Sequence, residues 1–579
     1  MFGRVLFTFS VVLVALVLAT ACATPTPVTK EVVKEVTKVV EATKIVEATK
    51  IVEATKIVQQ VVTPTPVPAP SKKGGTFIVY IAGDPVSLNA IMGNDGNSLP
   101  SVYLTQEPLV LGGENWGHKL LPNLAEKWEM SKDGKVWTFN LRKDVKWQDG
   151  KPFTADDVLF TFATVQDPKV QSAGFRQRLM EGDKPIKFEK LDDYTIRATL
   201  QNPNPVLAQA IGVPIIPKHI LDGQDVNKAP YNQKPIGLGA FKVTDWKSGE
   251  SVTLEANPNY FKGAPYLDKW IFRVIPNQDA VVVALQSGEV DFANVRGKDV
   301  PKFLGNSKYN VVTAPVDLAR YIMLNQAKPQ FQDKRVRQAL SMTLDRQAII
   351  DAAEQGYGVV ADSHFNQPVS VYKAGKLAVP KQDFAKAKAL MTEAGWVDTN
   401  NDGIVEKDGK PFKITLEYNP GWTFMSPVAS LIQAWWKQIG VDVTIRTYDA
   451  ATFTTKVFRS SDIDKPYDAV LNGWGFYGTE ANGYAAYYAP STVGASPFNY
   501  QNPEIKTLFD KARASLDDKE RATLYEQAEK MMWDDLPMIP MYYPVRIFVH
   551  NSKVMLDEAV LDTSRFLPFL YPEKVYLRK

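Results

Sequence analysis

The segment from 413 to 474 constrains the fold most, because its apolar residues switch between the spacing of a strand and that of a helix. Ile414, Leu416 and Tyr418 alternate as on a half-buried strand. The residues that then keep helical spacing are Val428, Leu431, Ile432, Trp435 and Ile439, and a second alternating run consists of Val441, Val443 and Ile445. A strand, a helix and a strand in this order predict parallel pairing with a right-handed crossover. The predicted fold class is therefore α/β.

A third strand at 467–471 runs directly into a loop rich in glycine and aromatic residues. In open α/β sheets, ligands bind beyond the carboxyl ends of the strands. The loop residues that we therefore expect in a ligand site are Trp474, Gly475, Tyr477, Glu480 and Asn482. Trp422 has the same placement, because it follows the strand that ends at Tyr418. The alternative is that the aromatic side chains only pack in the core, where such residues are common.

The first 22 residues have the pattern of an export signal. Arg4 precedes an uncharged apolar stretch at 5–18, which is shorter than the ~20 residues of a membrane-spanning helix. Small residues then lead to Cys22, the only cysteine of the chain. The sequence LATAC at 18–22 resembles a bacterial lipobox, whose cysteine carries a lipid, so we expect a lipid anchor on Cys22. The alternative is an ordinary cleavage site beside an unrelated cysteine.

A low-complexity stalk is predicted at 23–70. The hexad Glu-Ala-Thr-Lys-Ile-Val occurs three times from Glu41 to Val58, and a proline-rich stretch ends at Pro70. Six residues turn ~600° on an α-helix, so the isoleucines of the three hexads point in different directions and form no apolar stripe. The stalk also has no aromatic residue with which to build a core, so we expect it to act as a spacer.

The body from 71 to 579 is long enough for two or three packed regions. The whole chain has a net charge of +3 and its body has no basic block, so nucleic acid is not an expected partner. After residue 70, no apolar run is long enough to span a membrane. The four histidines include no close pair, and motifs for a nucleophile or a phosphate loop are missing, so we expect neither an enzyme nor a cofactor.

One acidic loop resembles the first half of a calcium-binding loop. Asp398, Asn400 and Asp402 offer oxygens at positions 1, 3 and 5, and Gly403 follows at position 6. Position 12 is Gly409, where such loops need a bidentate glutamate. The sequence therefore favours a structural turn without a metal site, and a calcium loop is the alternative.

The stretch from 145 to 158 carries a family signature. It is predicted to form a strand, a glycine turn and a helix that is capped by Thr154, with Asp157 at its third position. It closely resembles the signature of the extracytoplasmic solute-binding proteins of family 5, which serve oligopeptide, dipeptide and nickel ABC importers. Further matching segments are 235–241, 257–261, 284–291 and 333–346, and apolar residues from Val336 to Ile350 fit the face of a packed helix.

The resemblance implies a two-lobed fold of the periplasmic-binding-protein type II, with an extra inserted domain and a hinge between the lobes. The expected regions are a signal peptide at 1–22, the stalk at 23–70, lobe I at 74–111 plus 231–325 plus 540–579, the insert at 112–230 and lobe II at 326–539. The chain is expected to cross between the lobes near Leu324 and near 537–543.

The function implied by the resemblance is that of an extracytoplasmic, membrane-anchored substrate-binding protein of an ABC importer. We expect a monomer that captures short peptides between its lobes and delivers them to the permease subunits, with the lipid anchor as its only contact with the membrane. An oligosaccharide is the alternative ligand, and a glycoside or peptide hydrolase is a third interpretation. Relatives that carry peptides have an aspartate for the α-amino group where this chain has Tyr477, which leaves Glu480 as the acid to bind an amine. Tyr103 joins the expected ligand residues by resemblance alone.

Overall fold

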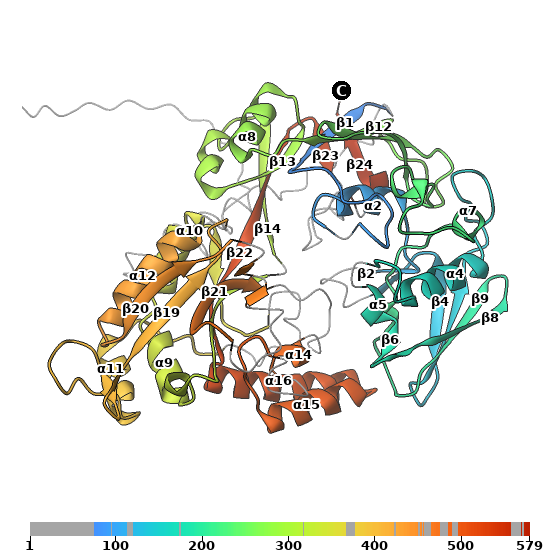
Figure 1. Ribbon diagram of the computed structural model, residues 1–579. Coiled ribbons are helices and arrows are strands. Elements are labelled where there is room, and N and C mark those ends of the chain that lie inside the picture. The colour runs from blue at the N-terminus through green and yellow to red at the C-terminus, as the bar shows by residue number, and fades with distance from the viewer. Residues whose placement is uncertain are drawn as a thin grey trace, which may run out of the picture. The chain divides into compact units, whose positions relative to one another are not determined.

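Figure 1 shows the computed structural model, in which the body of the chain is described. The described residues are 74–93, 95–112, 120–172, 175–316, 318–365, 377–421, 424–449, 452–453, 455–456, 465–474, 484–488, 496–556, 569 and 572–578. Of Trp474 only the backbone is described.

Among these residues, twelve strands form one mixed sheet. Its order is β10 (Phe241–Lys247), β11 (Ser251–Ala256), β12 (Lys269–Val274), β1 (Thr76–Ile81), β13 (Phe292–Val295), β22 (Met538–Asn551), β15 (Ala319–Leu324), β21 (Ala469–Trp474), β19 (Lys413–Tyr418) and β20 (Asp442–Thr447). β14 (Tyr309–Pro315) and β16 (Gly358–Val360) also pair with β22. We call β10, β11, β12, β1, β13 and β14 the lobe I sheet. The lobe II sheet consists of β15, β21, β19, β20 and β16.

The long strand β22 belongs to both sheets. Its first residues, up to Tyr542, pair antiparallel with β15, and its later residues, from Val545, pair antiparallel with β14 and β13. The chain crosses a second time between Pro315, the last residue of β14, and Ala319, the first residue of β15. The crossing at 542–545 overlaps the range 537–543 expected from the sequence, whereas the other crossing lies before β15 and not after it, near Leu324, as expected.

The lobe II sheet confirms the predicted succession of strand, helix and strand. β19 pairs in parallel with β20 and with β21, and α12 (Met425–Lys437) makes the crossover. The tryptophan at the centre of the core is Trp436 and not Trp435, because Trp436 is fully buried and Trp435 only in part. β21 begins at Ala469, two residues later than expected, and continues to Trp474.

The apolar face from Val336 to Ile350 belongs to two helices, α9 (Lys334–Met342) and α10 (Arg346–Glu354), where the sequence suggested one. Asp345 separates them, because its side chain accepts a hydrogen bond from the amide of Ala348 and so caps α10. α11 (Phe384–Glu393) and α12 complete this core. The second core of lobe II contains residues of α14 (Ala485–Tyr488), α15 (Pro503–Ala514) and α16 (Asp518–Asp535).

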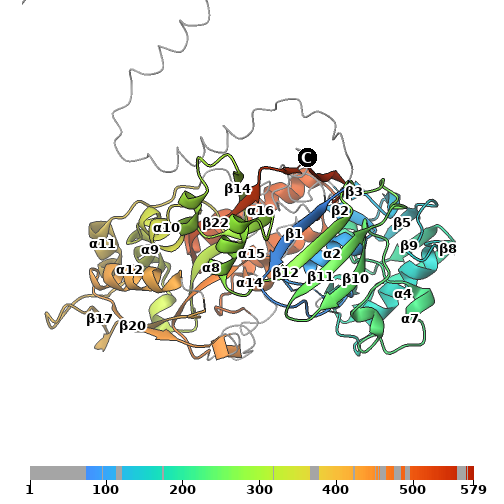
Figure 2. The same cartoon turned by 90° about the horizontal axis from the view of Figure 1, so that it is seen from above.

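In the lobe I sheet, β1 pairs in parallel with β12 and β13, and Figure 2 shows β10, β11, β12 and β1 side by side. The α-helices of this lobe within the described ranges are α2 (Leu99–Thr105) and α8 (Gln278–Ser287). Gly237 lies against the end of α2 so closely that a Cβ atom would be 1.7 Å from the carbonyl oxygen of Thr105. The family-matched segment 235–241 therefore has a scaffold role.

The inserted region has its own sheet and its own core. The sheet is antiparallel, in the order β4 (Ala125–Met130), β5 (Val136–Leu141), β9 (Thr195–Thr199) and β8 (Lys187–Asp192). Trp137, Phe139 and Leu141 are buried on β5, as their alternation predicts. α4 (Ala155–Gln166) begins with the predicted capping box of Thr154 and Asp157.

The remaining elements are short. They are β2 (Val110–Gly112), β3 (Leu120–Pro122), α5 (Phe175–Arg178), β6 (Met180–Glu181), β7 (Lys184–Pro185), α6 (Leu207–Ala210), α7 (Lys218–Leu221), η2 (Pro230–Asn232), η3 (Gly297–Lys302), η4 (Pro329–Phe331), β17 (Glu406–Lys407), β18 (Lys410–Pro411), β23 (Val554–Leu556), η9 (Pro572–Lys574) and β24 (Val575–Leu577). Within the described ranges, no helix combines the length and the apolar character that crossing a membrane requires.

Candidate ligand-binding site

The carboxyl ends of β19 and β21 lie side by side, because the two strands pair in parallel. β15 runs the other way, so its first residue, Ala319, pairs with Trp474 at the end of β21. In open α/β sheets this edge is where ligands bind. The backbone of Trp474 therefore lies at the edge that its position in the sequence predicts.

The other expected site residues are not brought together in the described part of the chain. Gly475, Tyr477, Glu480, Asn482, Trp422 and Cys22 lie outside the described residues. Tyr103 is on α2, where it packs partly buried against the lobe I core. The roles given to these residues stay predictions.

Arg320, on β15, fills the space beside Gly473 at this edge. A Cβ atom on Gly473 would lie 2.1 Å from a guanidinium nitrogen of Arg320, so only glycine leaves room for this side chain. On another side, the ring centroid of Phe424 lies 4.3 Å from Cζ of Arg320, a cation–π contact. Burial lowers the pKa of Arg320, which nevertheless remains a cation at neutral pH. The edge thus has a fixed positive charge on the face of the sheet that α12 covers.

A buried polar chain joins Arg320 to the crossing strand. The hydroxyl of Tyr542, on β22, donates to Oε1 of Glu354 at 3.0 Å, and Glu354 is the last residue of α10. Burial raises the pKa of Glu354, and the charge of Arg320 opposes that rise. Charge and hydrogen bonding therefore link β15, α10 and β22 beside the crossing between the lobes.

Glu417 places a carboxylate inside lobe II. Its side chain is 0% exposed, and its Oε1 lies 3.4 Å from Nη1 of Arg446 on β20. The same nitrogen donates to the hydroxyl of Tyr448 at 3.1 Å, and the ammonium of Lys456 lies 3.9 Å from the Tyr448 ring centroid. Burial raises the pKa of Glu417 from 4.5 to about 7, against the opposing charges of Arg446 and Lys456. The carboxyl group therefore titrates near neutral pH.

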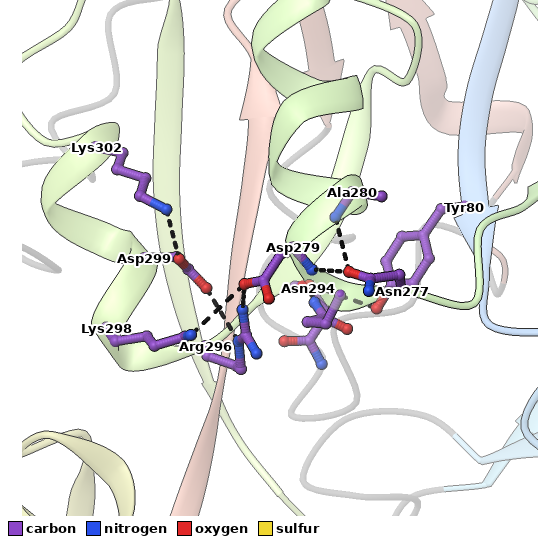
Figure 3. Close-up of polar contacts among 10 residues, drawn as sticks. Tyr80, Asn277, Asp279, Ala280, Asn294, Arg296, Lys298, Asp299 and Lys302 are labelled. Carbon is purple, nitrogen blue, oxygen red and sulfur yellow. Dashed lines mark hydrogen bonds and ion pairs between the residues drawn. The ribbon is translucent and has the colours of Figure 1, made fainter.

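The equivalent edge of the lobe I sheet is also polar, and Figure 3 shows its contacts. Tyr80, near the end of β1, donates from its hydroxyl to the carbonyl oxygen of Asn294 on β13 at 3.4 Å. Asn277 caps α8 by accepting from the amides of Asp279 and Ala280. These contacts anchor the start of α8 at the carboxyl ends of the strands.

Charged side chains beside this edge pair with one another (Figure 3). Arg296 forms ion pairs with Asp279 and Asp299, and Lys302 pairs with Asp299 at 2.8 Å. The hydrogen bond from Arg296 holds the pKa of Asp279 below its usual value. Because most of these groups are exposed, pairing with the opposite charge contributes little to stability.

The acidic loop of lobe II is organised by its own hydrogen bonds. Oxygens of Asp398, Asp402 and Glu406 lie within 4.8 Å of one another. Glu406 accepts from the amide and the hydroxyl of Thr399, both at 2.9 Å, and the Asn400 amide nitrogen donates to Glu406 and Asp402. Asn400 thus turns a donor, and not an oxygen, toward the acids. This arrangement favours the structural turn, and the calcium loop with Asp398, Asn400 and Asp402 as ligands stays an untested alternative.

Glu417 and Arg320 were missed by the sequence reasoning. Strands buried on both faces are usually near-continuous apolar runs, and both residues interrupt such a run. A charged residue one place before the end of a predicted strand was therefore an available signal for Glu417. No comparable signal places Arg320 beside Gly473, because their contact joins residues far apart in the chain.

Comparison with known proteins shows a close family likeness. The chain matches the model of the bacterial extracellular solute-binding proteins, family 5 Middle, over residues 119–496. It is 33% identical to the oligopeptide-binding protein AppA of Bacillus subtilis (strain 168) over 485 residues, which cover 82% of this chain and 87% of that protein. The dipeptide-binding protein of Escherichia coli (strain K12) is 28% identical over 81% of this chain and 90% of its own length.

Solved structures show the same likeness in three dimensions. The ABC transporter substrate-binding protein CtaP of Listeria monocytogenes matches with a TM-score of 0.77 and 32% identity, covering 88% of this chain and 100% of its own. AppA of Bacillus subtilis, solved with a nonapeptide, matches with a TM-score of 0.70 and 29% identity over the same shares. The predicted two-lobed α/β fold is confirmed by these matches. The relatives are substrate-binding proteins and not enzymes, as the sequence predicts for this chain.

Proposed function

The chain belongs to the bacterial extracellular solute-binding proteins of family 5, and we propose that it captures short peptides for an ABC importer. It is a substrate-binding protein that acts outside the cytoplasm, and not an enzyme. The observation that supports peptides as its ligands is the identity of 33% with the oligopeptide-binding protein AppA over 82% of the chain.

The proposed mode of action is closure of two lobes over the peptide. Two crossings join the lobes, one between β14 and β15 and the other within β22. A hinge of two short crossings permits rotation of one lobe against the other, so that a solute is buried between two walls. The closed form is then a distinct state that permease subunits can recognise and unload. The domain limits expected from the sequence belong to this proposal, except that β15 (Ala319–Leu324) pairs within the lobe II sheet and not in lobe I.

The proposed ligand wall is the edge where β19 and β21 end. Its residues are Trp474, Gly475, Tyr477, Glu480 and Asn482 after β21, Trp422 after β19, and Tyr103 from lobe I. Aromatic rings provide a large contact area at low conformational cost, and they tolerate varied side chains on the ligand. Such a wall fits a receptor that binds peptides of varied sequence.

The proposed location is the outer side of the cell membrane, with a lipid on Cys22 and residues 23–70 as a spacer. A Cys22→Ser substitution should release the protein from membranes without changing its fold, because the helices of the described ranges are not membrane elements. Fractionation after a salt wash measures the effect, with the unmodified chain as the control. A Cys22→Ser protein that still sediments with membranes would contradict the anchor.

The ligand class is tested by identifying what the mature chain carries when it is purified. Mass spectrometry of the released solutes should find short peptides, and calorimetry should then show binding to a peptide panel and none to cello-oligosaccharides. Binding of oligosaccharides alone would refute the peptide proposal and leave the family assignment intact. Conversion of any solute into a product during incubation would refute the receptor function itself.

A further inference from the structure

Two buried oxygen atoms at the ends of neighbouring lobe II strands lack a hydrogen-bond donor among the described residues. One is Oε2 of Glu417, whose side chain is 0% exposed, and the other is Oδ1 of Asn472, which is 1% exposed. Buried polar atoms are nearly always hydrogen-bonded in native proteins, because leaving one without a partner costs stability. Two such acceptors close to one edge therefore require an explanation.

The pairing of the strands places both side chains on one face. Glu417 of β19 is in register with Val470 of β21, and residues in register on parallel strands point to the same side. Asn472 follows Val470 by two residues, so it points to that side as well. Each acceptor lies within two residues of its strand's carboxyl end, which is Tyr418 for β19 and Trp474 for β21. This is the edge at which ligands of open α/β sheets bind.

The groups around Glu417 leave one of its two oxygens for another partner. Arg446, on β20, approaches Oε1 and donates to the Tyr448 hydroxyl, and a hydrogen bond from that hydroxyl to the Glu417 carboxylate lowers the pKa of Glu417. The charge of Lys456 lowers the pKa of Glu417 and that of Asp468 raises it, but neither group hydrogen-bonds to the carboxylate. Tyr467, which precedes β21, donates its hydroxyl to the carbonyl oxygen of Pro497, and the charge of Glu417 adds to the rise that burial causes in the pKa of Tyr467. Two cations, Arg446 and Lys456, thus lie near the carboxylate of Glu417. Its Oε2 atom nevertheless accepts no hydrogen bond from the described residues.

The chemistry of the two atoms defines the missing group. A carboxylate oxygen and an amide oxygen only accept hydrogen bonds, so their common partner is a donor. A positively charged donor is favoured, because it also offsets the cost of ionising a buried carboxylate. A protonated amine fits this requirement, because it carries three donors on one nitrogen.

We propose that Glu417 and Asn472 bind a protonated amine of the solute, so that this protein selects ligands by a free amino group. The inference rests on the proposed function, in which the solute is a peptide. A peptide presents this group at its N-terminus or on a lysine side chain, and the two sources share the same chemistry. The charged acceptor is then supplied by β19 itself and not by Glu480 in the loop after β21.

Binding of an amine at this site must be linked to protons. Without a ligand, Glu417 is about half protonated near pH 7, since burial raises its pKa to about 7. A bound ammonium group favours the carboxylate form, so binding near pH 7 releases about half a proton per ligand. Affinity should therefore fall as the pH is lowered from 7 toward 5.

The experiment measures the binding of three peptides by calorimetry to the mature chain and two variants. The peptides are a tetrapeptide without lysine, its N-acetylated form, and the N-acetylated form with one lysine. The variants are Glu417→Gln, which removes the charge and keeps the shape, and Glu480→Gln, which removes the other candidate acid for an amine. The unmodified chain should bind the free tetrapeptide at least ~10-fold more tightly than the acetylated one, as expected for a charge-assisted hydrogen bond.

In Glu417→Gln this preference should vanish while the affinity for the acetylated form stays the same, and Glu480→Gln should keep the preference. Recovery of affinity by the acetylated lysine peptide would identify the side-chain amine as an accepted source, and no recovery would identify the N-terminus. Equal weakening of both forms in Glu417→Gln, or loss of the preference only in Glu480→Gln, would overturn the inference. If the unmodified chain binds none of the peptides, the proposed function fails instead.

A second measurement avoids any substitution. Calorimetry of the unmodified chain at pH 7, in buffers with different heats of ionisation, counts the protons released on binding. We expect about half a proton with the free tetrapeptide and none with its acetylated form. Equal proton counts for the two peptides would overturn the inference even if the Glu417→Gln variant does not fold.

Discussion

At the scale of single residues, the end of the lobe II sheet has a pair of opposite charges on its two faces. Arg320 lies on the face covered by α12, between Gly473 and Phe424, and Glu417 lies on the other face with Arg446. Burial acts on both in the same sense, since it disfavours the charged form and so lowers the pKa of Arg320 and raises that of Glu417. Only Glu417 is thereby brought to a pKa near neutrality, so it is the group whose charge responds to pH.

Stability should depend on pH through Glu417. Its pKa is higher in the folded chain, at about 7, than its ordinary value of 4.5, so its contribution is fully present below pH 4.5 and is lost as the pH rises through 7. The unmodified chain should therefore lose up to ~3 kcal/mol of unfolding free energy relative to Glu417→Gln between about pH 5 and pH 8. Urea unfolding of both proteins at the two pH values measures this difference. A difference that does not change with pH would show that Glu417 is ionised throughout.

The tryptophan at the end of β21 gives a second test at this scale. Truncating an aromatic anchor in a desolvated site costs ~2 kcal/mol or more, so Trp474→Ala should weaken peptide binding at least ~30-fold. Calorimetry measures the effect, and Trp435→Ala on α12 is the matched control because Trp435 packs at the lobe II core. Unchanged affinity in a folded Trp474→Ala protein would mean that this ring does not contact the ligand.

At the scale of elements, the spacing of apolar residues predicts β5, α4, β19, α12 and β20, because each of them buries one face and has a clear start or end. The spacing does not show where one helix becomes two. The apolar face continues across 343–345, and the cap made by Asp345 decides the break. It also does not distinguish Trp435 from Trp436, since one residue turns a helix by only ~100°.

The sequence predicts at which edge of the sheet the candidate site lies, but not which side chains meet there. The order of strand, helix and strand predicts which edge holds the ligand, and Trp474 ends β21 at that edge. The side chains that meet there come from β15, β19, β20 and the start of α12, which are distant in the sequence. Contacts such as that of Arg320 with Gly473 depend on the tertiary fold, so no local pattern announces them.

The contact between β15 and β21 gives a test at this scale. In Gly473→Ala, the new methyl group would lie 2.1 Å from the Arg320 guanidinium, so Arg320 must leave its place beside Phe424. Overpacking of this kind typically costs ~1–3 kcal/mol of unfolding free energy. Gly96→Ala is the control, because its Cβ would meet nothing within 4 Å. Urea unfolding should show the loss only in Gly473→Ala, and the double variant with Arg320→Ala should lose less. Equal stability of the two single variants would contradict the close packing of Arg320.

At the scale of the whole molecule, the two crossings between the lobes, one within β22 and one between β14 and β15, predict a change of size on ligand binding. Small-angle scattering of the chain with and without a bound peptide should show a smaller radius of gyration in the complex, because rotation about a hinge closes the lobes over the ligand. A peptide with no measurable affinity is the control. An unchanged radius at saturating peptide would contradict closure as the mode of capture.

The position of β22 in the chain also sets the order in which the molecule can be assembled. β22 occupies Met538–Asn551 of 579 residues and pairs with strands of both sheets. A growing chain therefore lacks an interior strand of each sheet until the other eleven strands of the twelve have been made. Neither half can finish folding early while the other is still being synthesised, so the two halves mature together. For a protein that acts outside the cytoplasm, this late completion of both sheets keeps the chain unfolded, and so able to cross a membrane, until β22 has been made.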